Sequence, residues 1–246
     1  MIGTDFITLV LSILAVFIVL PIHELAHGYV AYKLGDNTAR DLGRLTLNPL
    51  KHLDIIGAIS LILFHFGWAK PVPVDLNNLK NPKRDFALVA IAGPASNLLL
   101  SFFSVPLWLA LRLLFIKTYV QGAFFTSFLK ILLNFVGIFH SINLGLAIFN
   151  LIPVPPLDGS RVLASFLPDK ANLWLIKNQN KIYISLLAWL FLGEAAASLL
   201  LASPLAASPV FSVIANIISL SSLLNTVSSF ISDLMFSLWQ LIPAFR

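Results

Sequence analysis

The chain contains no cysteine and few charged residues. None of its 246 residues is Cys and only 11% are charged, whereas soluble domains carry about 25% charged residues. The absence of Cys excludes disulfides and thiolate metal sites, so any metal must be held by His, Asp or Glu. The scarcity of charge, together with a hydrophobic fraction of 58%, excludes a water-soluble fold and predicts a surface that faces lipid.

Other features that the sequence lacks indicate how the chain is organised. No polar stretch is long enough to fold as a separate domain of about 100 residues, and there is no internal repeat. Nucleic-acid motifs are absent, which argues against a nucleic-acid partner. The N-terminus has no basic segment and no small-residue cleavage site after its apolar run, so we expect a retained first helix rather than a signal peptide. We therefore predict a single integral-membrane domain over residues 1–246.

Long apolar runs predict an all-α polytopic membrane protein with about six transmembrane or membrane-embedded helices. The expected helices cover residues 6–32, 86–115, 124–150, 159–167, 182–202 and 210–230, with an interfacial tail over 231–246. The apolar run at 55–66 is too short to span and favours a re-entrant element. The two prolines in 67–74 predict an extended segment there. We thus expect a small β-strand or re-entrant element after the first helix.

The distribution of Lys and Arg predicts the orientation. Eight lie in 33–84 and four in 161–181, and both segments fall on one side if 86–115 and 124–149 each cross the bilayer. Only Arg112, Lys117 and Lys130 belong to the opposite side. The positive-inside rule places the richer side in the cytoplasm.

The pattern His23-Glu24-Leu25-Ala26-His27 closes the first apolar run. Histidines four residues apart on a helix share one face, so both imidazoles can reach one metal ion. Glu24 is placed to act as a general base on a metal-bound water. From residue 6 to His23 is about 26 Å of helix, which keeps the site inside a hydrocarbon core of roughly 30 Å, toward its cytoplasmic half. Ionisable groups at that depth are costly and usually functional.

A catalytic zinc usually has three protein ligands, and Asp158 is our candidate for the third. It follows a stretch with three prolines in four positions, Pro153-Val154-Pro155-Pro156, which breaks the helix. Gly159 relieves close packing after the acid. Broken backbone at membrane depth is tolerated where it is buried or lines a cavity. The alternative is that Asp158 only caps the helix at 159–167.

Taken together, His23-Glu24-x-x-His27, Asn150 and Leu157-Asp158-Gly159 resemble the site-2 protease family of intramembrane zinc metalloproteases. Gly93-Pro94-x-x-Asn97 and residues 66–73 match the same pattern. The stretch 28–49 is similar to the compact prokaryotic branch, which has no inserted PDZ or CBS domain. The resemblance covers a core at about 6–170, and the helices over about 171–246 are accessory and generic.

The resemblance implies a role for each matching residue. His23, His27 and Asp158 would bind one zinc ion per chain, and Glu24 would be the general base. Asn150 would stabilise the oxyanion or align the scissile peptide, and Asn97 would hold the core helices or the substrate. The remaining predicted substrate-binding residues form a strand that pairs with an unwound substrate helix: Trp68, Lys70, Pro71, Val72, Pro73 and Val74.

Purely structural roles remain as alternatives for several of these residues. Asn97 and Asn150 would serve equally as interhelical hydrogen-bonding groups, and Trp68 as an interfacial anchor. His52, His65 and His140 are expected to be satisfied or interfacial histidines rather than ligands.

The leading hypothesis is an intramembrane zinc endopeptidase of the prokaryotic inner membrane. It would cleave within or near the transmembrane segments of membrane-tethered proteins, with the lipid bilayer and such a substrate as its partners. Two alternatives use the same residues: a metal transporter or sensor, and an inactive chaperone of transmembrane segments. The sequence leaves the substrate and the oligomeric state open.

Overall fold

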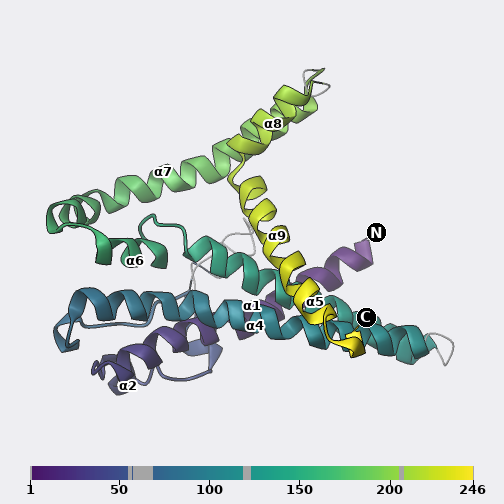
Figure 1. The fold of residues 1–246 in the computed structure, drawn as a ribbon, viewed down its shortest axis with the longest axis horizontal. Coiled ribbons are helices and arrows are strands. Elements are labelled where there is room, and N and C mark those ends of the chain that lie inside the picture. Colours follow the sequence, from purple (N-terminus) through teal and green to yellow (C-terminus); the bar gives the residue numbers. More distant parts are fainter. Residues whose placement is uncertain (1, 55–56, 58–68, 119–122, 205–207, 246) are drawn as a thin grey trace.

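The computed structural model describes residues 2–54, 57, 69–118, 123–204 and 208–245. Within them the chain is helical and contains no strand. Figure 1 shows the arrangement of these elements. The α-helices are α1 (Ile2–Lys33), α2 (Thr38–Asp41), α4 (Pro82–Thr118), α5 (Ala123–Asn150), α6 (Asp158–Phe166), α7 (Asp169–Ala202), α8 (Pro209–Ile218) and α9 (Leu220–Gln240). Short 3-10 helices are η1 (Pro49–Lys51), η2 (Leu76–Asn78) and η4 (Pro243–Phe245).

Helices α1, α4 and α5 form the core of the molecule. Helix α4 packs against both others, and α6 packs against α4. Small side chains allow these helices to approach closely: Ala15 and Val19 of α1, Val89 and Ala90 of α4, and Ala147 of α5 are fully buried. The three-helix core therefore holds rigidly the segments that carry the predicted site.

The last three helices are arranged differently. Helices α7 and α8 form an arm that extends away from the core, and α9 runs back toward it (Figure 1). Met235 of α9 packs with Val105, Leu109 and Leu144 in an apolar cluster. The Trp239 indole N–H donates to the carbonyl of Phe102 at 3.0 Å, so the end of α9 is fastened to α4.

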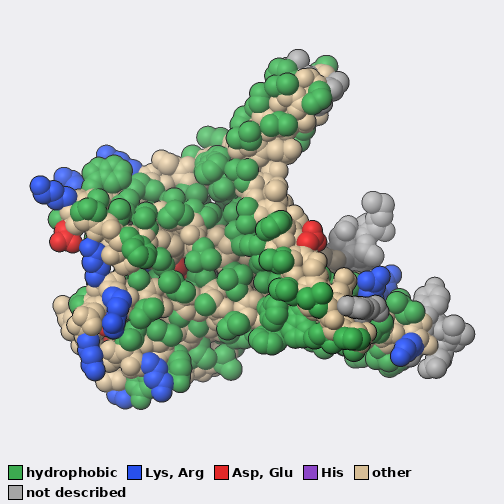
Figure 2. All heavy atoms as spheres, in the orientation of Figure 1, with side chains coloured by type: hydrophobic (Ala, Val, Ile, Leu, Met, Phe, Trp, Pro, Cys, Tyr) green, Lys and Arg blue, Asp and Glu red, His purple; other side chains and the backbone are tan. Residues whose placement is uncertain are grey.

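Among the described residues, four helices are long and apolar enough to cross a membrane: α1, α4, α5 and α7. A fifth crossing results if α8 and α9, which meet at an angle of 91°, count as one broken span. The all-helical membrane class is thus confirmed, whereas the expected number of about six is not. The exposed surface is dominated by apolar side chains (Figure 2), as lipid contact requires.

The expected β element is not confirmed. In the described part of 33–84 there is one isolated antiparallel bridge, between Leu53 and Ala69, and 70–75 is extended without being a strand. The two prolines explain this, because they remove the N–H groups that a ladder would need. Almost all of the run 55–66, expected to be re-entrant, lies outside the described residues.

The expected continuous helix over 210–230 is wrong, because the chain breaks at Ser219 into α8 and α9. The Ser219 hydroxyl accepts the N–H of Ser222 at 3.0 Å and so caps the N-terminus of α9. The Trp189 indole N–H donates to the carbonyl of Ile218, the last residue of α8, at 2.9 Å. Helix α9 then continues to Gln240, where an interfacial tail was expected.

Candidate active site

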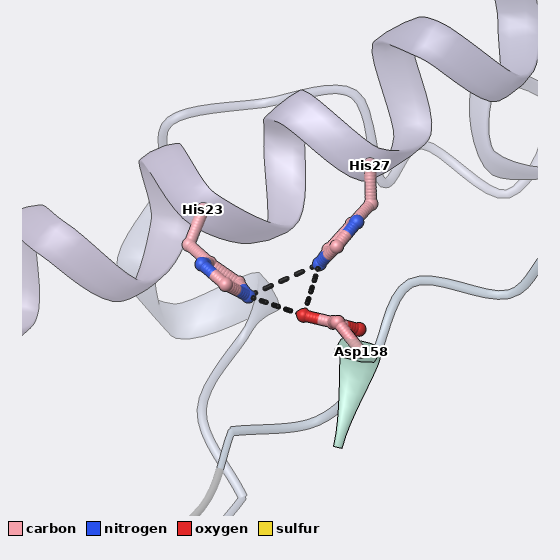
Figure 3. A group of neighbouring side chains, drawn as sticks. All are labelled: His23, His27 and Asp158. Carbon is pink, nitrogen blue, oxygen red and sulfur yellow. Dashed lines mark hydrogen bonds and ion pairs between the residues drawn. The ribbon is translucent and has the colours of Figure 1, made fainter. Parts of the chain in front are cut away.

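Helix α1 presents His23 and His27 on one face, and the start of α6 brings Asp158 to them (Figure 3). The two Nε2 atoms are 3.0 Å apart. Asp158 Oδ2 lies 3.3 Å from Nε2 of His23 and 3.2 Å from Nε2 of His27. All three residues are buried. The structure thus brings together three residues that are far apart in the sequence.

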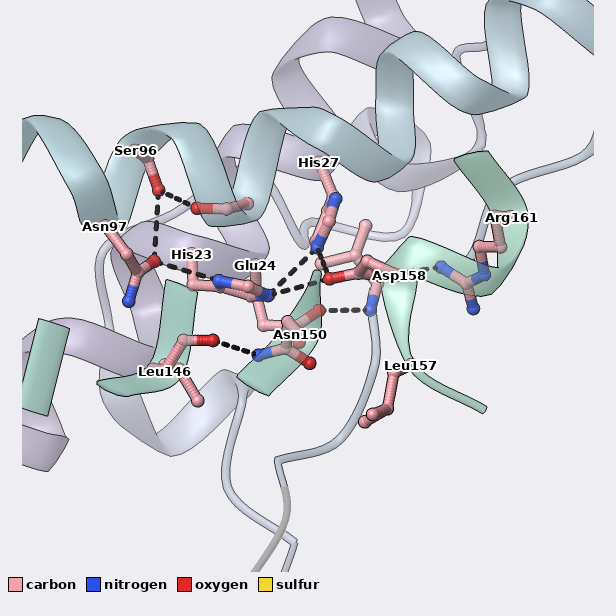
Figure 4. Close-up of polar contacts among 12 residues, drawn as sticks. His23, Glu24, His27, Ser96, Asn97, Leu146, Asn150, Leu157, Asp158 and Arg161 are labelled. Atoms are coloured by element: carbon pink, nitrogen blue, oxygen red, sulfur yellow. Dashed lines mark hydrogen bonds and ion pairs between the residues drawn. The ribbon is translucent and has the colours of Figure 1, made fainter. Parts of the chain in front are cut away.

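Hydrogen bonds to the other ring nitrogens orient both imidazoles (Figure 4). His27 Nδ1 donates to the carbonyl oxygen of Val89 at 2.7 Å, and His23 Nδ1 donates to Asn97 Oδ1 at 2.9 Å. A neutral imidazole that carries its proton on Nδ1 has a lone pair on Nε2. Both Nε2 atoms are therefore presented as acceptors toward the Asp158 carboxylate.

This donor set fits a zinc ion. Three electron-rich atoms that converge at 3.0–3.3 Å repel one another unless a cation lies between them. Tetrahedral ligands at about 2.0–2.1 Å from zinc are about 3.3–3.4 Å apart, close to the observed separations. Two imidazoles with one carboxylate are a common set for catalytic zinc. Within the described residues this is the one cluster of His, Asp and Glu close enough to hold a metal.

Two glycines make the close packing around the cluster possible. A Cβ on Gly93 of α4 would lie 2.3 Å from His27 Nε2 and 2.6 Å from His23 Nε2, so no larger residue fits against the imidazoles. A Cβ on Gly159 would lie 2.2 Å from the carbonyl oxygen of Leu151. Gly159 thus allows the proline-rich turn to fold back over the start of α6, as the sequence predicted.

Asp158 is held in place from its other side. Its Oδ1 accepts a hydrogen bond from Arg161 Nη1 at 3.3 Å, which leaves Oδ2 toward the histidines. The guanidinium of Arg161 in turn stacks over the ring of Phe86, 5.2 Å from the centroid. The N-cap of α6 is Leu157 and Asp158 makes no capping bond, so the capping alternative is wrong.

Glu24 connects the metal cluster to the extended segment at 69–75. Its Oε2 accepts the backbone N–H of Val72 at 2.7 Å. The segment lies along α1 and lines the same cavity as the cluster, through Ala69, Pro71, Val72 and Val74. The residue predicted as general base and the segment predicted to bind substrate are therefore neighbours.

Two residues that the sequence analysis did not single out anchor this segment. Arg44 Nη2 donates to the carbonyls of Lys70 and Pro71, at 2.7 and 3.2 Å. Asp36 is fully buried, and its Oδ2 accepts the N–H of Asp75 at 2.8 Å. Burial raises the pKa of Asp36, but hydrogen bonds from Thr38, Asn78 and Asp75 outweigh it and hold the pKa below its usual value. The residues around Asp36 predicted a turn but not a buried acid, because Asp36 becomes buried only when its turn packs against residues 75–78.

Asn150, at the end of α5, lines the cavity, and its Nδ2 donates to the Leu146 carbonyl one turn earlier at 3.0 Å. Asn97 lies across the imidazole of His23 from Asp158 and is fully buried. The bond between Asn97 and His23 joins α4 to α1, as the interhelical alternative expected, whereas the bond of Asn150 to Leu146 stays within α5. Trp68 lies outside the described residues.

The other histidines are not part of the cluster. His140 is hydrogen-bonded to Ser101 and Ser232, both at 2.9 Å, and His52 Nε2 lies 2.9 Å from the carbonyl of Thr46. His65 lies outside the described residues. His140 thus conforms to the expectation of a satisfied histidine, whereas the buried Nδ1 of His52 has no partner among the described residues.

A cavity of about 580 Å³ contains the cluster. Its floor is formed by the histidines, Glu24 and Asp158, and one wall by Asn150 and neighbouring residues of α5. The facing wall belongs to α7, through Tyr183, Leu186, Leu187 and Leu190. Ionisable groups thus lie at the bottom of a largely apolar cavity, as at many enzyme sites.

A helical membrane protein with a paired-histidine and aspartate cluster beside a glutamate has the site of a zinc-dependent hydrolase. Comparison with known proteins assigns the family. The model of Peptidase family M50 matches residues 11–193. The chain therefore belongs to this family, that of the site-2 proteases.

Three relatives have names that begin "Putative zinc metalloprotease". YwhC of Bacillus subtilis is 47% identical over 146 residues, which cover 59% of this chain and 64% of that protein. The protein sll0528 of Synechocystis is 33% identical over 73% of this chain and 36% of its own length. MJ0611 of Methanocaldococcus jannaschii is 32% identical over 63% of this chain and 69% of its own length. The chain thus spans less than two thirds of YwhC and sll0528. No solved structure matches the chain significantly.

Proposed function

We propose that this protein is an intramembrane zinc endopeptidase that hydrolyses peptide bonds within or near the transmembrane segments of membrane-tethered proteins. The observation that carries the proposal is the convergence of His23, His27 and Asp158, next to Glu24, in one cavity of an apolar helical protein. The family and the names of the relatives support a metallopeptidase. The lipid-facing exterior supports action inside the bilayer.

In this proposal His23, His27 and Asp158 hold one zinc ion per chain. Bound zinc supplies Lewis acidity, which polarises a peptide carbonyl and lowers the pKa of water toward about 7. Asn97 and the Val89 carbonyl keep the Nδ1 protons in place, so each Nε2 stays available as a ligand. Arg161 holds the second carboxylate oxygen of Asp158.

Glu24 acts as the general base and then as the acid. The Val72 N–H fixes Oε2, so Oε1 is the atom that takes the proton from water and passes it to the leaving amine. Asn150, on the α5 wall of the same cavity, orients the scissile peptide or stabilises its developing oxyanion.

The extended segment receives the unwound substrate. A transmembrane helix must open locally before its carbonyls are accessible, and pairing with an extended edge replaces lost backbone hydrogen bonds. Pro71 and Pro73 have no N–H, and the N–H of Val72 is used by Glu24. In the described part of the chain the N–H of Val74 has no partner. Between Pro71 and Val74, Val74 is therefore the donor left for a substrate strand.

We also propose the orientation and location. The side rich in Lys and Arg faces the cytoplasm of a prokaryotic cell, and the cluster opens toward that half of the inner membrane. A metal transporter would need further ligand groups along a path, and the described residues contain no second cluster.

A trapping experiment tests the function. Glu24→Gln protein, expected to bind zinc and substrate without turnover, is used to capture membrane proteins from its host, and the captured protein is then incubated with each purified variant. We expect the wild type to cut it inside or beside its transmembrane segment, as located by mass spectrometry, and Glu24→Gln to leave it intact with equal zinc content. Cleavage by Glu24→Gln at the wild-type rate contradicts the proposal.

A second experiment tests the substrate-binding edge. Val74→Pro removes the remaining N–H, and Val74→Ala is the matched control that keeps it. We expect Val74→Pro to raise KM or abolish cleavage with the zinc content unchanged, and Val74→Ala to cleave normally. Equal kinetics of the two variants would exclude pairing at Val74.

A further inference from the structure

Helix α7 is longer than the membrane requires. Its 34 residues, Asp169–Ala202, extend over about 51 Å at 1.5 Å per residue, whereas the hydrocarbon core is about 30 Å thick. The apolar part, 182–202, already covers about 32 Å. The first 13 residues, 169–181, therefore lie outside the hydrocarbon, at the end of the molecule where Lys and Arg gather (Figure 2).

One face of this first part carries a basic stripe. Its members are spaced by four, three and four residues, which places them on one side of a helix. They are Lys170, Trp174, Lys177 and Lys181. All four are exposed, with Trp174 exposed to 60%, and the adjacent Leu173 is exposed to 65%. A surface with cations, an indole and an aliphatic side chain together is suited to a membrane interface.

The lysines of the stripe have no protein counter-charge. No carboxylate in the described parts of the chain forms an ion pair with Lys170, Lys177 or Lys181. The nearest acid along the helix, Asp169, pairs with Lys83 of α4 at 3.5 Å. Lys83 also donates to the carbonyl of Leu167 at 2.6 Å. The loop before α7 is thus fastened to α4, and the stripe is left free to meet anions outside the protein.

We infer that the stripe binds the headgroups of anionic phospholipids. The phosphates of the leaflet lie at the depth where the apolar part of α7 ends. Lys181 and Lys177 lie about 2 and 8 Å beyond the apolar part, so their ammonium groups reach the phosphate oxygens. Trp174 and Lys170, about 12 and 18 Å beyond it, lie toward the outer edge of the headgroups.

The contact matters for the cavity because the same helix forms its wall. Two residues after Lys181, Tyr183 begins the row that faces the cluster, and Leu190 ends it. Helix α7 makes few contacts with α1, α4 and α5 and packs mainly against α8 and α9. The lipid headgroups therefore hold the start of the helix that closes one side of the cavity.

Fluorescence quenching in proteoliposomes tests this inference without using proteolysis. The emission of Trp174 is obtained as the difference between the unmodified protein and Trp174→Phe. The quenchers are brominated phosphatidylglycerol and brominated phosphatidylcholine. We expect brominated phosphatidylglycerol to be enriched around Trp174 about fivefold or more over its bulk share, since each lysine near the surface contributes about that factor. High salt should reduce the enrichment in the unmodified protein, because exposed charges are screened.

A charge-matched pair of variants locates the effect. Lys170→Gln/Lys177→Gln/Lys181→Gln should bring the enrichment close to one. Arg112→Gln/Lys117→Gln/Lys130→Gln removes the same charge from the other side and should leave it unchanged. Equal quenching by the two lipids in the unmodified protein overturns the inference. Enrichment that persists when Lys170, Lys177 and Lys181 are replaced also overturns it, as does an equal loss of enrichment when Arg112, Lys117 and Lys130 are replaced. Any of these results leaves the proposed peptidase activity untouched.

Discussion

Polar groups are buried and held by fixed partners in the three-helix core, whereas they are exposed in the C-terminal arm. In the core, His23, His27 and Asp158 are buried and each is oriented by a second residue. In the arm, Glu194 is exposed on α7 and accepts hydroxyl hydrogen bonds from Ser219 and Ser221 at the break between α8 and α9. The buried groups of the core are thus fixed in one geometry, as the proposed metal site requires, whereas the hydroxyl contacts at the helix break shape the arm.

The family match follows the same division. It covers residues 11–193, which include α4, α5, all but the first nine residues of α1 and about three quarters of α7, and stops before Glu194. We therefore expect substitutions in the core to affect zinc binding and cleavage, and substitutions at the end of the arm to affect stability alone.

Gly93→Ala should have the largest effect. The new methyl would lie 2.3 Å from His27 Nε2, so either α4 or the imidazoles must move. A displacement of about 1 Å at a catalytic site costs about 100-fold in rate. Zinc content by mass spectrometry and cleavage rate measure the loss. Gly137→Ala on α5, where a Cβ would meet nothing closer than 3.8 Å, is the control, and equal behaviour of the two variants would contradict a special role of Gly93.

Asn97→Ala should weaken zinc binding by about 10–100-fold, the usual effect of removing the partner of a histidine ligand. The loss of Oδ1 frees His23 Nδ1 from its acceptor, so the ring is no longer fixed. Competition with a zinc chelator gives the affinity. Asn143→Ala is the control, since Asn143 is equally buried but bonds only to the Phe139 carbonyl of its own helix. Unchanged zinc affinity in Asn97→Ala would assign Asn97 to packing alone.

Asp36→Asn should destabilise the extended segment by about 1–3 kcal/mol, because it weakens the acceptor of a buried hydrogen-bond network. Because the folded pKa of Asp36 is lowered, its contribution is present above the unfolded pKa of about 3.9 and is lost as pH falls through the folded pKa. Hydrogen exchange of the Asp75 amide should thus differ between variant and wild type at pH 7. The difference should shrink when the protein is compared below pH 4. A difference independent of pH would contradict the assignment to the carboxylate.

Ser219→Ala, at the break in the arm, should have the smallest effect. It removes the cap of α9 and costs about 1 kcal/mol of stability, which a thermal melt in detergent detects. Zinc content and cleavage should equal those of the wild type. Loss of zinc from this variant would show that the arm supports the site, and the comparison would fail.

Sequence patterns predicted the core better than the arm, for physical reasons. The metal cluster was predictable because a helix places i and i+4 residues on one face, and because three prolines mark the break before Asp158. The bounds of α5 were predicted to within one residue at each end. The break at Ser219 was missed, because it depends on a contact between distant residues. The carbonyl of Ile218, which loses its helical partner at the break, accepts the indole N–H of Trp189 instead.

The contacts that hold the extended segment could not be predicted from sequence. Asp36 and Arg44 meet residues 26 to 42 positions away, and nothing in their local pattern indicates which backbone groups they bind. The length of α7 was also underestimated, because the prediction followed the apolar run that begins at residue 182. The helix begins at Asp169, after Pro168, and its first part is too polar to be found by hydropathy.

Anomalous X-ray diffraction at the zinc edge, from crystals of the zinc-loaded protein, shows whether His23, His27 and Asp158 hold the metal. We expect one anomalous peak per chain, about 2.0–2.2 Å from His23 Nε2, His27 Nε2 and a carboxylate oxygen of Asp158. A peak at other residues, or no peak between these three, would contradict it.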